Sequence, residues 1–161
     1  MKQLLFVIAM MILCSFTNTN NQDMNYHDRQ LDKLKFVTEQ AAAAAAQYKI
    51  SSKYGEGFIV FNRDEAIKAA EYYIKTNMKL DNNFNPIGFN YWTEKITYKI
   101  EFFDDDNTNF PYLYTHPSKD LIQTLTAPTV VITIDAGKPR YRNLKNIPDA
   151  VRISAHAWEG R

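Results

Sequence analysis

The chain begins with a short positive segment that is followed at once by an uninterrupted apolar run. Met1 and Lys2 form the start, and Leu4 to Phe16 (LLFVIAMMILCSF) carries no charged side chain. The polar stretch Thr17 to Asp23 (TNTNNQD) comes next. This layout is typical of a signal peptide, and it predicts export or attachment to a membrane.

The length of the run favours a cleaved signal over a permanent anchor. As a helix, its thirteen residues would extend for only ~20 Å, whereas the hydrocarbon core of a bilayer is about 30 Å thick. The cleavage site is poor, because the best small-residue pair, Ser15 and Thr17, forms no A-x-A triplet. Residues 1–22 are therefore interpreted as a signal peptide or an N-terminal membrane anchor. An acylated Cys14 and an internal buried element are the less favoured alternatives.

The composition predicts that residues 23–161 form one domain that folds by packing. Hydrophobic residues make up 45% of the 161-residue chain, and its aromatics are 10 Phe, 10 Tyr and 2 Trp, which excludes a disordered chain. The only cysteine is Cys14, so no disulfide can form within one chain. A net charge of +1 provides no field that would attract phosphate backbones, and nucleic acid is not an expected partner.

Two helices are expected in the first half of the domain. Apolar and small residues recur at helical spacing from Tyr26 to Lys49, and this segment ends with six alanines. Ala41 and Ala45 are candidate contact residues, which pack either on the sheet of the same domain or on neighbouring helices in an assembly. The second helix should start at the N-cap Asn62 and end near Leu80.

The second half of the domain changes to a period of two, which indicates strands. Ile96, Tyr98, Ile100 and Phe102 alternate with more polar residues. The expected strands are Phe58 to Phe61 (as a strand or an extended lead-in), Tyr91 to Phe103, Tyr112 to Thr115, Leu121 to Thr126, Thr129 to Asp135 and Ala150 to Trp158. Helices followed by strands predict an α+β fold with an antiparallel β-meander of about four to five strands.

An acidic turn is a weak candidate for a cation site. Asp104 and Asp106 place carboxylate oxygens in one turn, as a hard cation such as calcium requires. The spacing does not match an EF-hand loop, because Asn109 and Thr115 occupy the positions of its glycine and its bidentate glutamate. A solvated hairpin turn is the favoured interpretation.

No other residues form a recognisable catalytic or metal-binding motif. The three histidines, His27, His116 and His156, have no ligand-type partner at metal-binding spacing, and no cofactor is expected. We do not expect an enzyme. The least favoured alternative is a secreted hydrolase that assembles Asp104, Asp106, His116 or His156 from distant positions.

Aromatic residues gather in the middle of the chain. Tyr and Trp are favoured at interfaces, so Tyr91, Trp92, Tyr112 and Tyr114 are candidates for contact with a partner. Phe84, Phe89 and Phe110 belong to the same cluster. The alternative is that these side chains fill the core and the strands.

Three segments, EQAAAAAAQY, EAIKAAEYYIKTNMKLD and PTVVITI, together with the apolar N-terminal run, resemble the pseudopilin-like proteins of bacterial tight-adherence pilus systems. The resemblance is one of layout, since Leu4 to Phe16 contains no Gly-type prepilin processing site. It implies an N-terminal hydrophobic helix in the membrane or the filament core, and a small α+β head displayed outside.

The expected function is that of an exported or membrane-tethered structural or interaction protein of the bacterial cell surface, including a minor pilin-like assembly component. The alternative is a secreted binding module or inhibitor that holds a partner on its sheet face or aromatic loops. The expected partners are other protein chains, a second copy included, and the membrane through Leu4 to Phe16 if this run is not cleaved. Either function predicts an extracellular or cell-envelope location.

Overall fold

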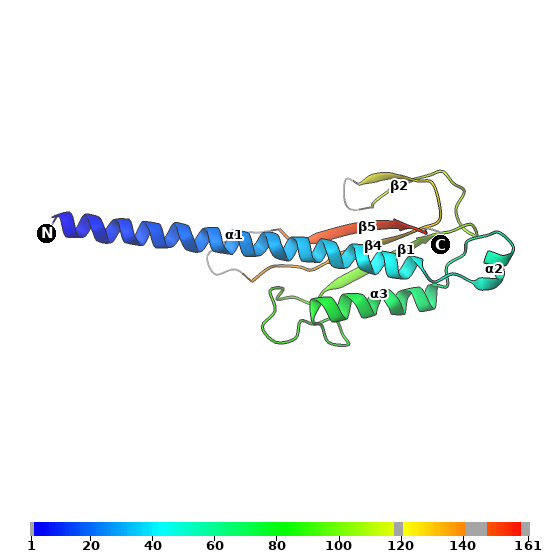
Figure 1. Cartoon of the computed structure of the whole chain (residues 1–161), viewed down its shortest axis with the longest axis horizontal. Coiled ribbons are helices and arrows are strands. Elements are labelled where there is room, and N and C mark those ends of the chain that lie inside the picture. Colours follow the sequence, from blue (N-terminus) through cyan, green and yellow to red (C-terminus); the bar gives the residue numbers. More distant parts are fainter. Residues whose placement is uncertain (1, 118–120, 141–147, 159–161) are drawn as a thin grey trace.

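A long helix carries a head at one end and projects from it at the other (Figure 1). The computed structural model describes residues 2–117, 121–140 and 148–158. The elements are α1 (Lys2–Ala46), α2 (Ser51–Gly55), α3 (Arg63–Met78), β1 (Thr97–Phe103), β2 (Tyr112–Thr115), β3 (Ile122–Leu125), β4 (Thr129–Asp135) and β5 (Val151–Ala157). The second half of α1 and all later elements form the head.

The expectation that a helix begins near Tyr26 is wrong, because α1 is continuous over 45 residues. The polar stretch after the apolar run contains neither Gly nor Pro, so nothing in it breaks a helix. The hydroxyls of Thr17 and Thr19 donate to the carbonyls of Leu13 and Ser15 one turn earlier, at 3.0 and 2.9 Å. The boundary expected between residues 22 and 23 therefore lies inside a helix.

The α+β fold with antiparallel strands is confirmed, with the strands divided between two sheets. β1, β4 and β5 form a three-stranded sheet in the order β1-β4-β5, and β2 pairs with β3 in a hairpin. The order departs from a simple meander, because β1 pairs with β4 and the hairpin is inserted between them. β4 (TVVITID) is buried along nearly its whole length, which suits a central strand covered on both faces.

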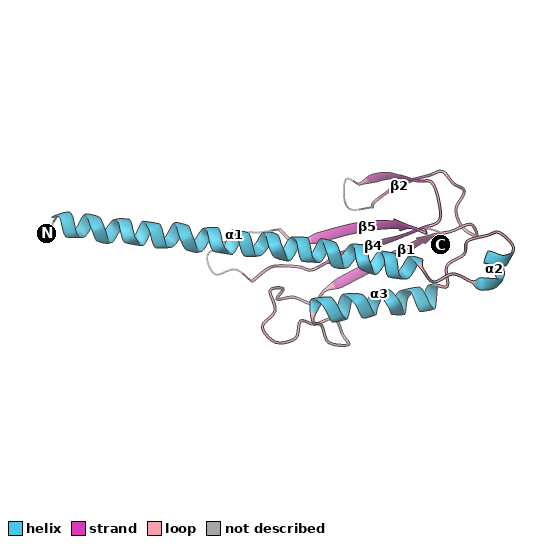
Figure 2. Ribbon diagram, in the orientation of Figure 1, coloured by secondary structure: helices cyan, strands magenta, loops and turns pink. Residues whose placement is uncertain are grey.

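The head has three layers (Figure 2). Val130, Ile132 and Ile134 of β4 join the main core, to which α1 and α3 contribute their buried faces. Val131 lies on the opposite face of the sheet, where it packs with Tyr114 and Leu125 of the hairpin. Alternate β4 side chains thus hold the helices on one face and the hairpin on the other.

The expected bounds of α3 and of most strands agree with the structure. The Asn62 side chain accepts a hydrogen bond from the Glu65 amide at 3.4 Å, and the C-cap Lys79 has a φ of 55°. The expected strand Tyr91 to Phe103 is shorter, since β1 begins at Thr97. Phe58 to Phe61 is extended but forms only an isolated bridge between Phe61 and Lys49.

Candidate functional site: the projecting half of the long helix

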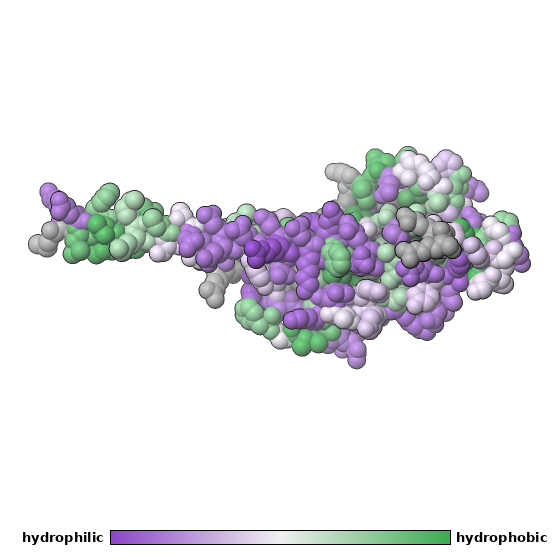
Figure 3. Space-filling view, viewed as in Figure 1, coloured by the Kyte–Doolittle hydropathy of each residue, from purple (hydrophilic) through white to green (hydrophobic). Residues whose placement is uncertain are grey.

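The first part of α1 is an apolar surface without a partner in the described part of the chain. Every side chain from residue 2 to residue 18 is exposed, including Leu5 at 67% and Phe6 at 68%. Figure 3 shows this segment as a hydrophobic rod outside the head. Of the helices described, α1 alone is long and apolar enough to cross a membrane, and a signal sequence has the same features.

The uncharged part of α1 is longer than its apolar run. No charged residue occurs between Lys2 and Asp23, which leaves twenty uncharged residues in the helix. At a rise of 1.5 Å per residue they extend for about 30 Å, the thickness of a hydrocarbon core. The six residues nearest the head, 17–22, are polar amides and hydroxyls. We call residues 3–22 the projecting segment.

Just after the projecting segment, α1 joins the head through contacts of Tyr26 and His27 with Tyr91. The ring of Tyr26 meets the Tyr91 ring edge-on with centroids 5.1 Å apart, and His27 Nδ1 lies 2.8 Å from the Tyr91 hydroxyl. Partial burial is the main factor that lowers the pKa of His27 below 6.5; nearby Arg152 lowers it further, whereas Asp28 opposes the shift. Tyr91 therefore fixes the point at which the helix enters the head.

A cavity of about 200 Å³ opens beside this junction. It is lined by Asp23, Tyr26, Phe89, Asn90, Tyr91 and Arg140. The Arg140 guanidinium lies 4.9 Å from the centre of the Phe89 ring, within the range of a cation–π contact. An exposed aromatic ring and a cation thus lie at the level where the charged part of α1 begins.

The alanines predicted as contact residues are fully buried inside the head. Ala41 and Ala45 have no exposed surface and belong to the main core. Their small side chains allow α1 to pack closely on α3 and the sheet. Of the two alternatives left open for them, packing within the same domain is the one that the structure shows.

The predicted aromatic contact residues do not form one surface. Tyr91, Trp92 and Tyr114 are at most 5% exposed, whereas Tyr112 is 41% exposed. Tyr112 stacks on Phe103 with ring centroids 5.4 Å apart. The exposed Leu113 and Ile122 lie on the other face of the β2–β3 hairpin, which points away from the main sheet, and they form a small apolar surface that we call the hairpin patch.

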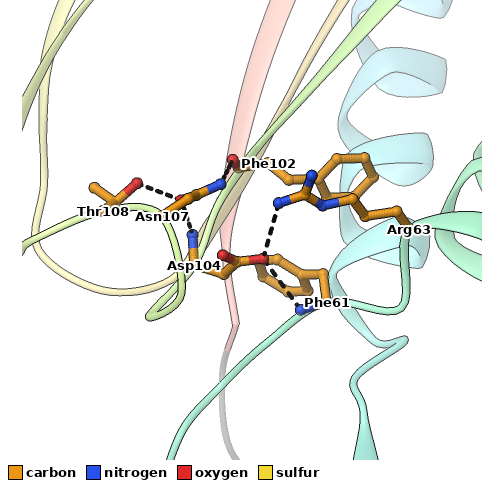
Figure 4. Close-up of polar contacts among 6 residues, drawn as sticks. All are labelled: Phe61, Arg63, Phe102, Asp104, Asn107 and Thr108. Atoms are coloured by element: carbon orange, nitrogen blue, oxygen red, sulfur yellow. Dashed lines mark hydrogen bonds and ion pairs between the residues drawn. The ribbon is translucent and has the colours of Figure 1, made fainter.

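Asp104, predicted to be solvated or to bind a cation, is instead a buried structural residue (Figure 4). Its Oδ2 accepts a hydrogen bond from the Phe61 amide at 3.4 Å and lies 3.8 Å from the guanidinium of Arg63. Its backbone amide donates to Asn107 Oδ1 at 2.9 Å. Asp106 is exposed on the same turn. Among the described residues, no three His, Cys, Asp or Glu side chains are placed to hold a metal ion.

The residues of the hydrolase alternative are not brought together. His116 Nε2 lies 3.1 Å from Thr133 Oγ1 on the hairpin side of the sheet. His156 is paired with Val130, whose side chain faces the helices, and directly opposed residues share a face. Asp104 is enclosed near the start of α3. These side chains therefore do not form a common site.

Sequence reasoning missed two features of the junction. The first is that residues 17–22 extend the helix; the absence of Gly, Pro and charge in this stretch is the signal that could have shown it. The second is that Arg140 lies beside Phe89. The two residues are far apart in the sequence, and no motif links them. No family model matches the chain, and no curated protein or solved structure matches it.

Proposed function

We propose that the protein is a membrane-tethered structural component of a bacterial cell envelope, which holds its α+β head outside the bilayer and assembles with other chains. One observation carries this proposal: α1 begins with an uncharged segment about 30 Å long, and its side chains are exposed outside the head as far as residue 18. The same helix continues into the core, where Leu34, Val37 and Ala41 are buried. A single rigid element would thus connect the bilayer to the head.

Along the projecting segment the side chains change from apolar to polar, as the layers of a bilayer do. The apolar residues 4–16 would lie in the hydrocarbon, where Leu, Ile and Phe each favour insertion by roughly 0.3–0.6 kcal/mol. The hydroxyls of Thr17 and Thr19 are satisfied within the helix. The amides Asn18, Asn20 and Asn21 lie nearest the head, where the hydrated headgroups begin.

Assembly with other helices would satisfy these amides further. In the headgroup region such hydrogen bonds between helices compete with water, so each contributes less than the roughly 1 kcal/mol that they reach in an apolar environment. An apolar helix in front of a small α+β head is also the layout of the pilin-like proteins that the sequence resembles. A minor pilin-like assembly component is therefore the role we propose.

The first test is where the full chain is found in its own cells and where its N-terminus lies. We expect an intact apolar segment in the membrane fraction that resists alkaline extraction. Ile8→Arg should release the protein, because an arginine near the centre of a span costs about 2.5–3.5 kcal/mol. Asn25→Arg, a charge on the exposed helix outside the span, is the matched control. A soluble protein with a new N-terminus near Asn18 would contradict the proposal.

A second candidate function is a secreted binding module, and the hairpin patch is the observation that favours it. Leu113 and Ile122 are 62% and 66% exposed on neighbouring strands. The helix-facing side of the main sheet is covered by α1 and α3, so a partner would bind at the hairpin. Leu113→Asp should then abolish capture of that partner, whereas Tyr72→Asp on the exposed side of α3 should not.

A further inference from the structure

The loop between α3 and β1 is held in one conformation by its own hydrogen bonds. Asp81 Oδ1 accepts from the amides of Asn83 and Asn85, both at 2.8 Å. The Ile87 amide donates to the Lys79 carbonyl at 2.9 Å, and Asn90 Nδ2 donates to the Met78 carbonyl at 2.8 Å. Residues 81–90 therefore form an ordered platform.

This platform presents two large apolar side chains to solvent. Phe89 is 87% exposed and Ile87 is 56% exposed, on either side of Gly88. An ordered loop that holds apolar groups away from the core is typical of a surface that binds a partner. In Figure 3 a hydrophobic area lies at the end of the head nearest the projecting segment, where Figure 1 places the loop after α3.

The level at which Phe89 lies beside α1 indicates what its partner is. Phe89 and Asp23 line the same cavity, and Asp23 is the first charged residue after the uncharged segment. If residues 4–16 lie in the hydrocarbon and the amides that follow lie where the headgroups begin, Asp23 lies within the headgroup layer, and Phe89 lies at the same level. The apolar loop and the helix would then meet one continuous surface.

The chemistry of this surface suits the headgroup region of a bilayer. Aromatic rings, here Phe89 and the 47% exposed Tyr26, are favoured where an apolar layer meets water. Arg140 lies over the Phe89 ring, so its guanidinium is placed at the same boundary. A guanidinium binds phosphate oxygens with two parallel hydrogen bonds.

We infer that Ile87, Phe89 and Arg140 form a second membrane contact, in which the two apolar side chains enter the headgroup region of a phospholipid bilayer beside α1 and Arg140 binds lipid phosphate. This inference rests on the proposed function, since it requires the projecting segment to span the bilayer. It adds that the head lies against the membrane surface rather than standing away from it.

The test places a reporter on the loop of the full chain, reconstituted in phosphatidylcholine vesicles that contain some phosphatidylglycerol. Phe89→Trp and Ile87→Trp should not disturb the fold, because both side chains are exposed. We expect brominated phosphatidylcholine to quench both reporters, with emission at shorter wavelength than in a control. The matched control is Phe58→Trp, next to α2 at the opposite end of the head, and the wild type gives the background from Trp92 and Trp158.

Three other results would overturn the inference, and they have different meanings. If the chain floats with the vesicles but the loop reporters are quenched no more than the Phe58→Trp control, the second membrane contact is rejected. The proposal that the projecting segment is a membrane anchor is then unaffected. If chains that carry both Phe89→Cys and Cys14→Ser cross-link to one another while the loop reporters stay unquenched, the loop binds a second copy instead. If the chain does not float with the vesicles, the proposed function fails as well.

Discussion

The guanidinium of Arg63 lies 3.8 Å from the carboxylate of Asp104, and the two side chains differ sharply in burial. The Arg63 side chain is 55% exposed, whereas Asp104 is fully buried. The carboxylate also accepts a hydrogen bond from the Phe61 amide, so it joins the end of β1 to the segment that leads into α3. Because Arg63 is largely in solvent, its charge is screened, and the ion pair itself contributes less than about 1 kcal/mol.

Asp104→Ala should lower the free energy of unfolding by about 2 kcal/mol, because the buried Phe61 amide loses its acceptor. Asp104→Asn should cost less, since an amide oxygen can still accept that hydrogen bond. Urea unfolding of the full chain in mild detergent measures both changes. Asp106→Ala, on the exposed part of the same turn, is the control and should change stability by less than about 0.5 kcal/mol. Equal effects at both positions would show that burial of Asp104 has no role.

Ala41→Leu should destabilise the head by about 1–3 kcal/mol, because the added atoms have no space in the core between α1, α3 and the sheet. Ala43→Leu is the matched control: Ala43 is partly exposed and lines a groove beside α3 that leaves room for a larger side chain. Thermal unfolding compares the two variants. If Ala41→Leu instead left the head stable and changed only its association with other chains, the alanine face would serve assembly.

The fold was largely predictable because its signals are local. The period of two in β1, the run of β-branched residues in β4 and the Asn62 cap each depend on neighbouring residues, and all of them agree with the structure. The pairing of β1 with β4 was not predictable in the same way. It depends on which strand is covered on both faces, and the hairpin that covers Val131 comes from a separate part of the chain.

The candidate site was predictable only in its apolar part. The run from residue 4 to residue 16 is evident from its composition, whereas the helical extension to residue 22 is polar, and only the absence of Gly, Pro and charge indicates it. Which of the predicted aromatic residues are available to a partner depends on their burial in the folded chain. Tyr91 and Tyr112 look alike in the sequence, but Tyr91 is enclosed by α1 and Tyr112 is not.

Tyr98→Phe should cost about 1 kcal/mol at neutral pH, because the Tyr98 hydroxyl donates to Glu71 and thereby joins β1 to α3. Hydrogen bonds from Lys75 and then from Tyr98 lower the pKa of Glu71 below 4.5. A lowered carboxyl pKa stabilises the native state above pH 4.5, and this contribution is lost as the pH falls through the folded value. The difference between wild type and Tyr98→Phe should therefore shrink in acid. Tyr72→Phe, at an exposed position on α3, should show no difference at either pH.

The pKa of His27 is lowered, so the unfolded chain binds a proton more readily than the native state below pH 6.5. Stability should therefore fall as the pH drops below 6.5, and it should level off below the folded pKa. His27→Gln removes this titration and should flatten that part of the curve. Thermal unfolding across this range and an NMR titration of the His27 ring measure the two quantities. A midpoint at or above 6.5 would contradict the prediction.

Gly137→Ala should destabilise the head by about 1–2 kcal/mol for two reasons that act together. Gly137 has a φ of +64°, a conformation that costs an L side chain free energy, and a Cβ there would lie 2.8 Å from Glu94 Oε2 and 3.1 Å from Glu94 Cβ. Gly137 also orders the chain after β4, since its amide donates to Asp135 Oδ1 and its carbonyl accepts from Ala150.

Gly55→Ala is the matched control for Gly137→Ala. No atom lies within 4 Å of a Cβ at Gly55, and this residue ends α2 without a positive φ. The substitution should be neutral or should stabilise by up to about 1 kcal/mol, because alanine restricts the unfolded chain. Urea unfolding of both variants separates the two contributions to Gly137. If Gly137→Ala and Glu94→Ala together regained wild-type stability, contact with Glu94 would account for the loss; if they did not, the backbone conformation would.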